Sequence, residues 1–316
     1  MTDKSIDISK LPSIASSNLL CSLNVSVWEG RKKDKQIEEE IAHDKGARSR
    51  RAASVYKNLF VDAPALEAIK SLRGEARIYI NKYTQPWNDN GERLLPCATY
   101  YEEVQAGMEK YTKRFDQLVN ILVANWNTEI SKQAFERGSM FNRDEYPSVD
   151  EIKDKFQFNF GIRPVPLAGD FRVDVGTEAL QKLQEMYNVE TQRCVQRAMS
   201  DAWERVKEQV EWVRERMDAV MGYDPDATDE VKNDDGTVEM KKKRRPKLYE
   251  SMLDTGVELC EILKSLNVTN DPALEEARRM LEKALLHTDI DSLKESKEVQ
   301  SKLKSAMDEI ADKFDW

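Results

Sequence analysis

The sequence predicts a mainly α protein: a long antiparallel helical hairpin with coiled-coil character, a small three-stranded β element and a C-terminal helical bundle. The 316 residues contain only 12 glycines and 10 prolines, below the average usage of about 12% for the two together. Two long stretches, 99–137 and 177–221, repeat apolar residues at three- and four-residue steps, the period of an amphipathic helix. Three short segments alternate apolar and polar residues instead, the period of a strand.

Residues 1–18 are polar and predict a flexible N-terminus, and a helical body carrying the small sheet is expected over 19–221. The first strand is expected at about 22–28, where apolar and polar residues alternate. Residues 31–60 are charged and helical in character, with an interruption near Gly46. A further helix begins at Pro64, a favoured first-turn residue, and runs to about Tyr83.

The first long helix is expected to start at Thr99, with Glu102 completing a capping box. At 1.5 Å per residue it would measure roughly 55–60 Å, so it needs a long partner, and 177–221 is the natural one. The near-heptad apolar seam of the first long helix, 99–137, consists of Val104, Met108, Tyr111, Phe115, Leu118, Leu122 and Trp126.

Between the long helices, Ser148 and Glu151 form a second capping-box signal. The other two strands are expected at about 156–160 and 170–175, and one apolar face is expected to join them to the first strand. Residues 222–246 lack periodicity and predict an exposed charged insertion, either a hairpin about Asp235-Gly236 or a disordered segment.

The C-terminal bundle, residues 247–316, is expected to contain helices at about 247–266, 272–287 and 290–314, with few ties to the rest of the chain. Asp271 and Pro272 give the middle helix a clear start, because Asp is a favoured N-cap and Pro is favoured at the first helical position.

The formal net charge of −9 argues against bulk attraction to nucleic acid or anionic lipid. Four widely spaced cysteines indicate reduced thiols that act as small buried hydrophobes. No stretch approaches the roughly 20 apolar residues of a membrane span, and the N-terminus lacks a signal-peptide core. We therefore expect a cytoplasmic protein without a membrane partner.

No catalytic constellation emerges, so we expect no enzyme activity, no cofactor and no metal. The chain lacks a phosphate-binding P-loop and a G-x-G-x-x-G dinucleotide motif. His43 and His287 have no ligand neighbours at metal spacing, which favours surface roles. Aspartates at 224–235 match a calcium loop only loosely, since Asp229 stands where glycine belongs.

Two basic clusters are candidate binding patches. The first combines 31–33 with 48–51, expected on one helical stretch; its cations are Arg31, Lys32, Lys33, Arg48, Arg50 and Arg51. The second consists of Lys241, Lys242, Lys243, Arg244 and Arg245. Acids just before the second cluster suggest internal charge matching, so the first patch is the better candidate for a phosphate or acidic partner.

Several short blocks, in order and spacing, resemble an uncharacterised family of tailed phages and bacterial mobile elements. They are Leu23-x-Val25-x-Val27-Trp28-Glu29-Gly30-Arg31-Lys32-Lys33, Gln85-Pro86-Trp87 through Gly91 to Arg93-Leu94-Leu95-Pro96, Tyr146-Pro147-Ser148 leading to Phe156-x-Phe158, and Pro164-x-Pro166. The resemblance covers about residues 19–220. Genes of this family often stand beside a MoxR-type AAA+ ATPase similar to the cobaltochelatase small subunit. The resemblance implies a phage or mobile-element origin, the host cytoplasm and an AAA+ ATPase partner, but no catalytic residues.

The favoured function is a non-enzymatic helical adaptor or assembly factor that works with an AAA+ ATPase or as a homo-oligomer. The alternative is a nucleic-acid-associated phage protein of replication, recombination or counter-defence: the basic patches favour it and the acidic balance disfavours it. An enzyme with a site assembled from distant acids, or a virion part, ranks lower. The apolar arc of 99–137 is wider than one partner helix needs, so self-association is expected through the long helices.

Overall fold

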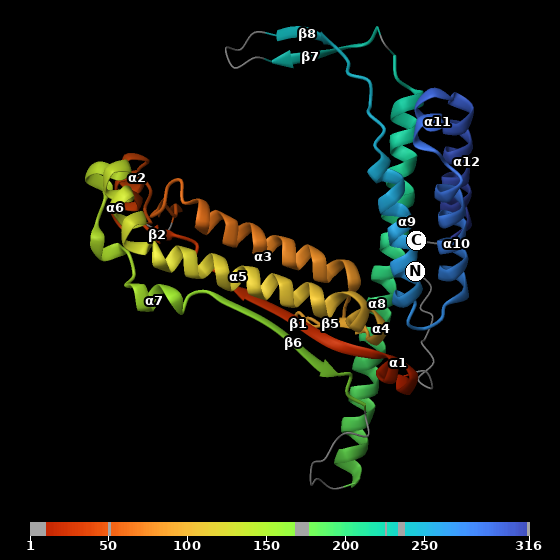
Figure 1. The fold of residues 1–316 in the computed structure, drawn as a ribbon, viewed down its shortest axis with the longest axis horizontal. Coiled ribbons are helices and arrows are strands. Elements are labelled where there is room, and N and C mark those ends of the chain that lie inside the picture. Colours follow the sequence, from red (N-terminus) through yellow and green to blue (C-terminus); the bar gives the residue numbers. More distant parts are fainter. Residues whose placement is uncertain (1–10, 50–51, 168–176, 225, 233–237, 315–316) are drawn as a thin grey trace. The chain divides into compact units, whose positions relative to one another are not determined.

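The computed structural model describes residues 11–49, 52–167, 177–224, 226–232 and 238–314, which are mainly helical with a small amount of sheet (Figure 1). The chain forms two compact units, and neither is continuous in sequence. The first unit contains the described parts of Met1–Leu20, Tyr83–Thr99 and Arg163–Trp316; the second contains those of Cys21–Lys82 and Tyr100–Ile162. Among the described residues, no helix is both long enough and apolar enough to cross a lipid bilayer.

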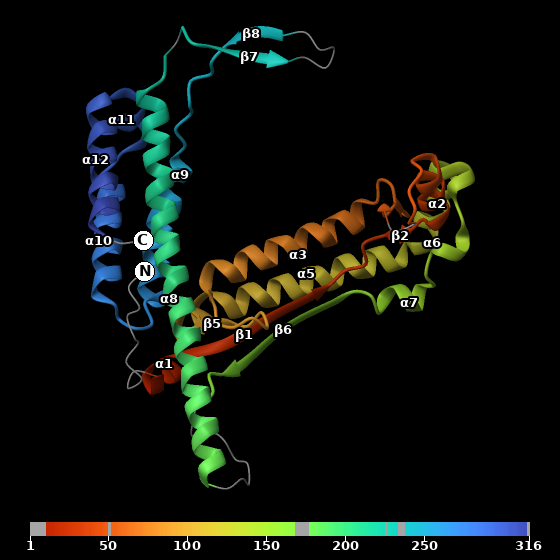
Figure 2. The ribbon, with the colours of Figure 1, turned by 180° about the vertical axis from the view of Figure 1, so that it is seen from behind.

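The first unit is a helical assembly in which α9, α10 and α12 pack with α8, and both views show α10 and α12 running beside α8 (Figures 1 and 2). The apolar stripe of α8 is buried at Val195, Ala202, Val206, Val213 and Met217. Its elements are α1 (Leu11–Ser17), β4 (Gln85–Pro86), β5 (Arg93–Pro96), α4 (Cys97–Thr99), α8 (Thr177–Met221), β7 (Thr228–Lys232), β8 (Val238–Lys242), α9 (Glu250–Leu266), α10 (Pro272–Leu286), α11 (Ile290–Glu295) and α12 (Lys297–Lys313).

The second unit packs α3 beside α5, as both views show (Figures 1 and 2). Its core joins Leu66, Ile69 and Leu72 of α3 to Phe115 and Leu122 of α5. Its elements are β2 (Arg31–Lys33), α2 (Lys35–Asp44), β3 (Tyr56–Asn58), α3 (Pro64–Tyr83), the π-helical turn η3 (Tyr100–Val104), α5 (Gln105–Ala124), α6 (Trp126–Arg137), the 3₁₀ turns η4 (Gly138–Met140) and η5 (Arg143–Glu145), and α7 (Val149–Lys153).

Strands β1 (Asn18–Ser26) and β6 (Gln157–Pro164) each contain a boundary between the units. The four-stranded sheet has the order β4-β5-β1-β6, and β4 pairs antiparallel with β5, with Gln85 opposite Leu94. Two separate ribbons complete the β structure: β2 pairs with β3, and β7 pairs with β8.

Several predicted elements are confirmed because their signals are local. The helices beginning at Pro64 and Thr177 end at Tyr83 and Met221 as expected. The Asp271 side chain accepts a hydrogen bond from the Ala273 amide, and Pro272 takes the first helical position. Both halves of the Ser148–Glu151 capping box are formed.

The helical interpretation of 31–60 is wrong over much of its length. Residues 31–33 form β2, paired with β3, and the α-helix between them is Lys35–Asp44. Asp34 starts α2 by accepting hydrogen bonds from the Gln36 and Ile37 amides, and Gly46, with a φ of +61°, follows its end. Pairing between distant segments outweighed the local helical preference.

The expected start at Thr99 is also wrong, because helical structure begins at Cys97 and passes through η3. The single helix to 137 is divided at Asn125 into α5 and α6. The expected antiparallel pairing of 99–137 with 177–221 is wrong as well: the two stripes belong to different cores, α5 with α3 and α8 with α9, α10 and α12. Apolar periodicity shows that a face is buried without specifying which face covers it.

Other boundaries also differ from expectation. Residues 11–17 form α1, with Ile14 buried, within the expected flexible terminus. The expected strand at 170–175 lies outside the described residues, and the sheet contains β4 and β5 beside β1 and β6. Within 222–246, β7 and β8 form the hairpin alternative. The C-terminal helices share one core with α8, so they are not a bundle with few ties to the chain.

Candidate functional site

An open groove in the second unit has a volume of about 560 Å³ and is lined by β1, β6, η3 and α5. On α5 the lining side chains follow the spacing i, i+3, i+4, i+7 and i+8, which is one face of a helix. They are Gln105, Met108, Glu109, Thr112 and Lys113. One continuous stripe of α5 therefore forms one side of the groove.

The two strands supply the opposite lining. Ser22 and Asn24 of β1 are two residues apart, so their side chains point to the same face of the sheet. Phe158 and Phe160 of β6 are related in the same way, and the Phe158 ring lies 5.4 Å from that of Phe115 in the core. Packing on Phe115 thus fixes one aromatic ring at the edge of the groove.

Tyr100, which also lines the groove, belongs to the π-helical turn η3. Such turns are rare, and they occur frequently at functional sites. Tyr79 supports this turn by donating a hydrogen bond from its hydroxyl to the Glu103 carbonyl oxygen at 2.9 Å. Gly107 leaves the room that the Tyr79 ring occupies.

The chemistry of the groove suits binding. Buried Met108 and the half-buried aromatic rings form an apolar floor, and exposed amide side chains stand at its margin. Glu109 and Lys113 add one charge of each sign and form no ion pair with another described residue. The Thr112 hydroxyl donates to the Met108 carbonyl oxygen at 2.9 Å, so its proton is engaged within the helix.

Each β2 cation of the first predicted basic patch lies near an acid, but Glu29 is shared with Arg73 and Glu145 is shared with Lys57. Arg31, Lys32 and Lys33 are exposed on β2, but Lys33 lies 3.1 Å from Glu38, and Lys32 lies 3.8 Å from Glu145. Arg31 lies 3.6 Å from Glu29.

The rest of that patch does not lie on the expected helix. Arg48 is exposed in a bend after α2, and Arg50 and Arg51 lie outside the described residues.

In the second predicted patch, Lys242, Lys243, Arg244 and Arg245 are all exposed. The side chain of Lys241 lies outside the described part of the structure. None of the four exposed cations forms a side-chain hydrogen bond or ion pair with another described residue.

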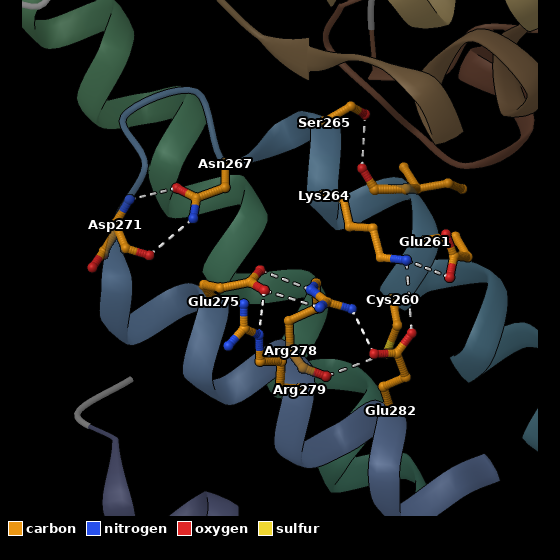
Figure 3. Close-up of polar contacts among 11 residues, drawn as sticks. Cys260, Glu261, Lys264, Ser265, Asn267, Asp271, Glu275, Arg278, Arg279 and Glu282 are labelled. Carbon is orange, nitrogen blue, oxygen red and sulfur yellow. Dashed lines mark hydrogen bonds and ion pairs between the residues drawn. The ribbon is translucent and has the colours of Figure 1, made fainter.

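A third polar cluster joins α9 to α10 (Figure 3). Arg278 is only 5% exposed and donates to Glu275 through Nε and Nη2 at 2.8 and 2.9 Å, and to Glu282 through Nη1 at 2.9 Å. The hydrogen bond from Arg278 lowers the pKa of Glu275 to about 2. Lys264 of α9 lies 3.8 Å from Glu282. The cluster satisfies a buried guanidinium and ties two helices together.

The cysteines behave as small buried side chains, as the sequence indicated. Cys21, Cys194 and Cys260 are buried, Cys97 is half-buried, and all four are free. Burial raises the pKa of Cys194 to about 11 and that of Cys260 to about 12, so both remain protonated at neutral pH and are poor nucleophiles. His43 and His287 are exposed. No group of three His, Cys, Asp or Glu side chains in the described ranges is arranged to hold a metal ion.

The groove was not predicted from the sequence. The signals that point to the groove are Gly107, which interrupts a strong helical pattern, and the alternating phenylalanines of 156–160. The groove forms where β1, β6 and α5 pack together. Apolar periodicity along one segment does not predict which other segments pack against it. No family model, curated protein or solved structure matches this chain significantly.

Proposed function

We propose that this protein is a non-enzymatic adaptor or assembly factor that binds a protein partner through the groove of its second unit. The observation that carries the proposal is an apolar floor bordered by polar side chains without partners among the described residues. Binding pockets commonly combine a largely apolar lining with a few polar groups that orient the ligand.

A peptide segment fits this lining. Met108, Phe158 and Phe160 can receive an apolar side chain, and such contacts supply most of the binding free energy of protein interfaces. The amides of Asn24 and Gln105 can pair with backbone N–H and C=O groups, which every peptide carries.

The biological setting follows from the sequence resemblance. We place the protein among the accessory proteins of phages or mobile elements, acting in the host cytoplasm with an AAA+ ATPase as its partner. Self-association is part of the same proposal, because apolar side chains remain exposed on the long helix α8.

The test uses three tagged full-length baits: the wild type, Asn24→Arg and Asn120→Arg. Asn24 lines the groove, whereas Asn120 is an exposed residue of α5 outside it, so the two variants make the same chemical change. Affinity purification from the native host cells, followed by mass spectrometry, should recover one stoichiometric partner with the wild type and Asn120→Arg. Asn24→Arg should lose it.

A partner retained equally by Asn24→Arg would contradict binding through the groove. A wild-type chain that recovers no stoichiometric partner would contradict the adaptor function itself. Identification of the recovered protein as the neighbouring AAA+ ATPase would support the wider setting.

A further inference from the structure

The two basic clusters differ in how much of their charge is available to a ligand. In the cluster on β2, acids lie within 4 Å of all three cations. In the segment Lys242–Arg245, four consecutive cations are exposed and form no ion pair with any described residue. The segment Lys242–Arg245 therefore offers the longer run of cations without acid partners among the described residues.

This basic segment leaves the β7–β8 ribbon and leads to α9 (Figure 1). Its start is fixed by backbone bonds: the Lys243 amide donates to the Ala227 carbonyl oxygen at 2.8 Å, and the Tyr223 hydroxyl donates to the Lys243 carbonyl oxygen at 3.1 Å. Pro246 follows Arg245, which favours an extended backbone before it. Extended residues send successive side chains to alternating sides, so the four cations line both sides of the segment and form a basic track along it.

Among the described side chains, no acid that precedes the segment forms an ion pair with its cations. In the ribbon register, Asp229 lies opposite Lys241, one position before the four exposed cations, and Glu230 lies opposite Met240. The Asp224 carboxylate accepts a hydrogen bond from the Asp226 amide at 3.0 Å, within its own turn. Acids elsewhere in the chain make the net charge negative. Dissolved salt screens their effect on the segment beyond a Debye length of about 8 Å at physiological salt.

An aromatic ring stands at the end of the track. Tyr249 follows Arg245 by four residues and is 52% exposed. A positive track together with an aromatic platform is the arrangement that binds single-stranded nucleic acid: cations contact the phosphates, and a base stacks on the ring. A membrane surface would instead favour an amphipathic helix, and residues 243–249 are not helical.

We propose that Lys242, Lys243, Arg244, Arg245 and Tyr249 form a binding site for single-stranded nucleic acid. The four cations hold phosphates of the strand, and Tyr249 stacks on one base. This site lies in the first unit, so it is independent of the proposed adaptor function.

The test measures fluorescence anisotropy of a labelled oligothymidylate of about 20 nucleotides with the full-length chain over a salt series. Four phosphate contacts predict a slope of about −3 for log affinity against log salt. The variant K242A/K243A/R244A/R245A should weaken binding at least about tenfold and flatten that slope. Tyr249→Ala should weaken binding without changing the slope, because stacking releases no counterions.

The control K110A/K153A/R77A/R114A removes the same number of lysines and arginines from exposed positions of the second unit. It lowers the net charge equally and should bind like the wild type. Equal weakening by both quadruple variants, or no salt-dependent binding by the wild type, would overturn the proposal. Binding to vesicles that contain phosphatidylserine, with none to the oligonucleotide, would overturn it in favour of a membrane surface.

Discussion

The ring of Tyr79 occupies the space that a side chain at position 107 would need. A β-carbon built on Gly107 would overlap the hydroxyl oxygen and two ring carbons of Tyr79. The same hydroxyl holds the Glu103 carbonyl of the π-helical turn. One glycine in the helical stretch therefore sets both the packing of α3 against α5 and the shape of the groove.

Gly107→Ala should destabilise the second unit by about 1–3 kcal/mol, the usual cost of forcing extra atoms into a packed site. Urea denaturation would measure this loss. Combining it with Tyr79→Ala should cost less than the sum of the single changes, because the smaller side chain removes the overlap. Additive losses would contradict the direct contact.

Phe158→Ala should destabilise the protein by about 2 kcal/mol, less than the roughly 3–5 kcal/mol of a fully buried phenylalanine. Phe158 is only half-buried, and its ring packs on Phe115. Phe135→Ala is the matched control, since Phe135 is 88% exposed and should change stability by less than about 0.5 kcal/mol. A decrease in unfolding free energy below about 1 kcal/mol for Phe158→Ala would show that this strand does not contribute to the apolar face.

Glu275 should contribute stability that depends on pH. Its pKa falls from an ordinary 4.5 to about 2 because Arg278 donates hydrogen bonds to it. A lowered folded-state pKa stabilises the fold above pH 4.5, and the contribution disappears as the pH falls through about 2. Glu275→Gln should therefore cost about 1–2 kcal/mol at pH 7, allowing for the partly exposed carboxylate, and much less near pH 2. The exposed Glu295→Gln is the control, and a pH-independent cost would contradict the assignment.

Limited trypsin digestion should cut after Lys243 and Arg244 before it cuts within any helix. These residues are exposed and follow the last paired residue of β8. Mass spectrometry of early fragments would locate the cuts. First cuts inside α8 or α9 would show that the segment is protected, and bound oligonucleotide should slow the expected cuts.

Self-association should depend on the N-terminal part of α8. Met186 and Val189 lie one turn apart and are 69% and 59% exposed. Light scattering at tens of micromolar should show an oligomer that Met186→Glu with Val189→Glu reduces to a monomer, whereas Ile78→Glu on α3 should not. A chain that ends near Met221 is unsuitable for this test, because α8 shares its core with α9, α10 and α12. A monomeric wild type would contradict self-association and leave only the proposed binding of a different partner protein.

Sequence signals within a few residues predicted the structure well. Ser148 with Glu151, and Asp271 with Pro272, start their helices as local capping chemistry requires. The sequence did not predict which segments pack together, because one amphipathic face can pack against many others. The pairing of β2 with β3, the choice of α3 as the partner of α5, and the groove all depend on such meetings. The charge of a basic cluster was visible in the sequence, but its ion pairs with Glu38 and Glu145 were not.

The discontinuous division of the chain sets an order of events during synthesis. The second unit has all of its residues once Ile162 has left the ribosome, whereas the first must wait for α12. At about 5–20 residues per second, the apolar stripe of α8 emerges on the order of ten seconds before the helix that covers it. Ribosome-stalled chains ending soon after α8 should therefore carry a protease-resistant second unit beside a helix that chaperones can bind.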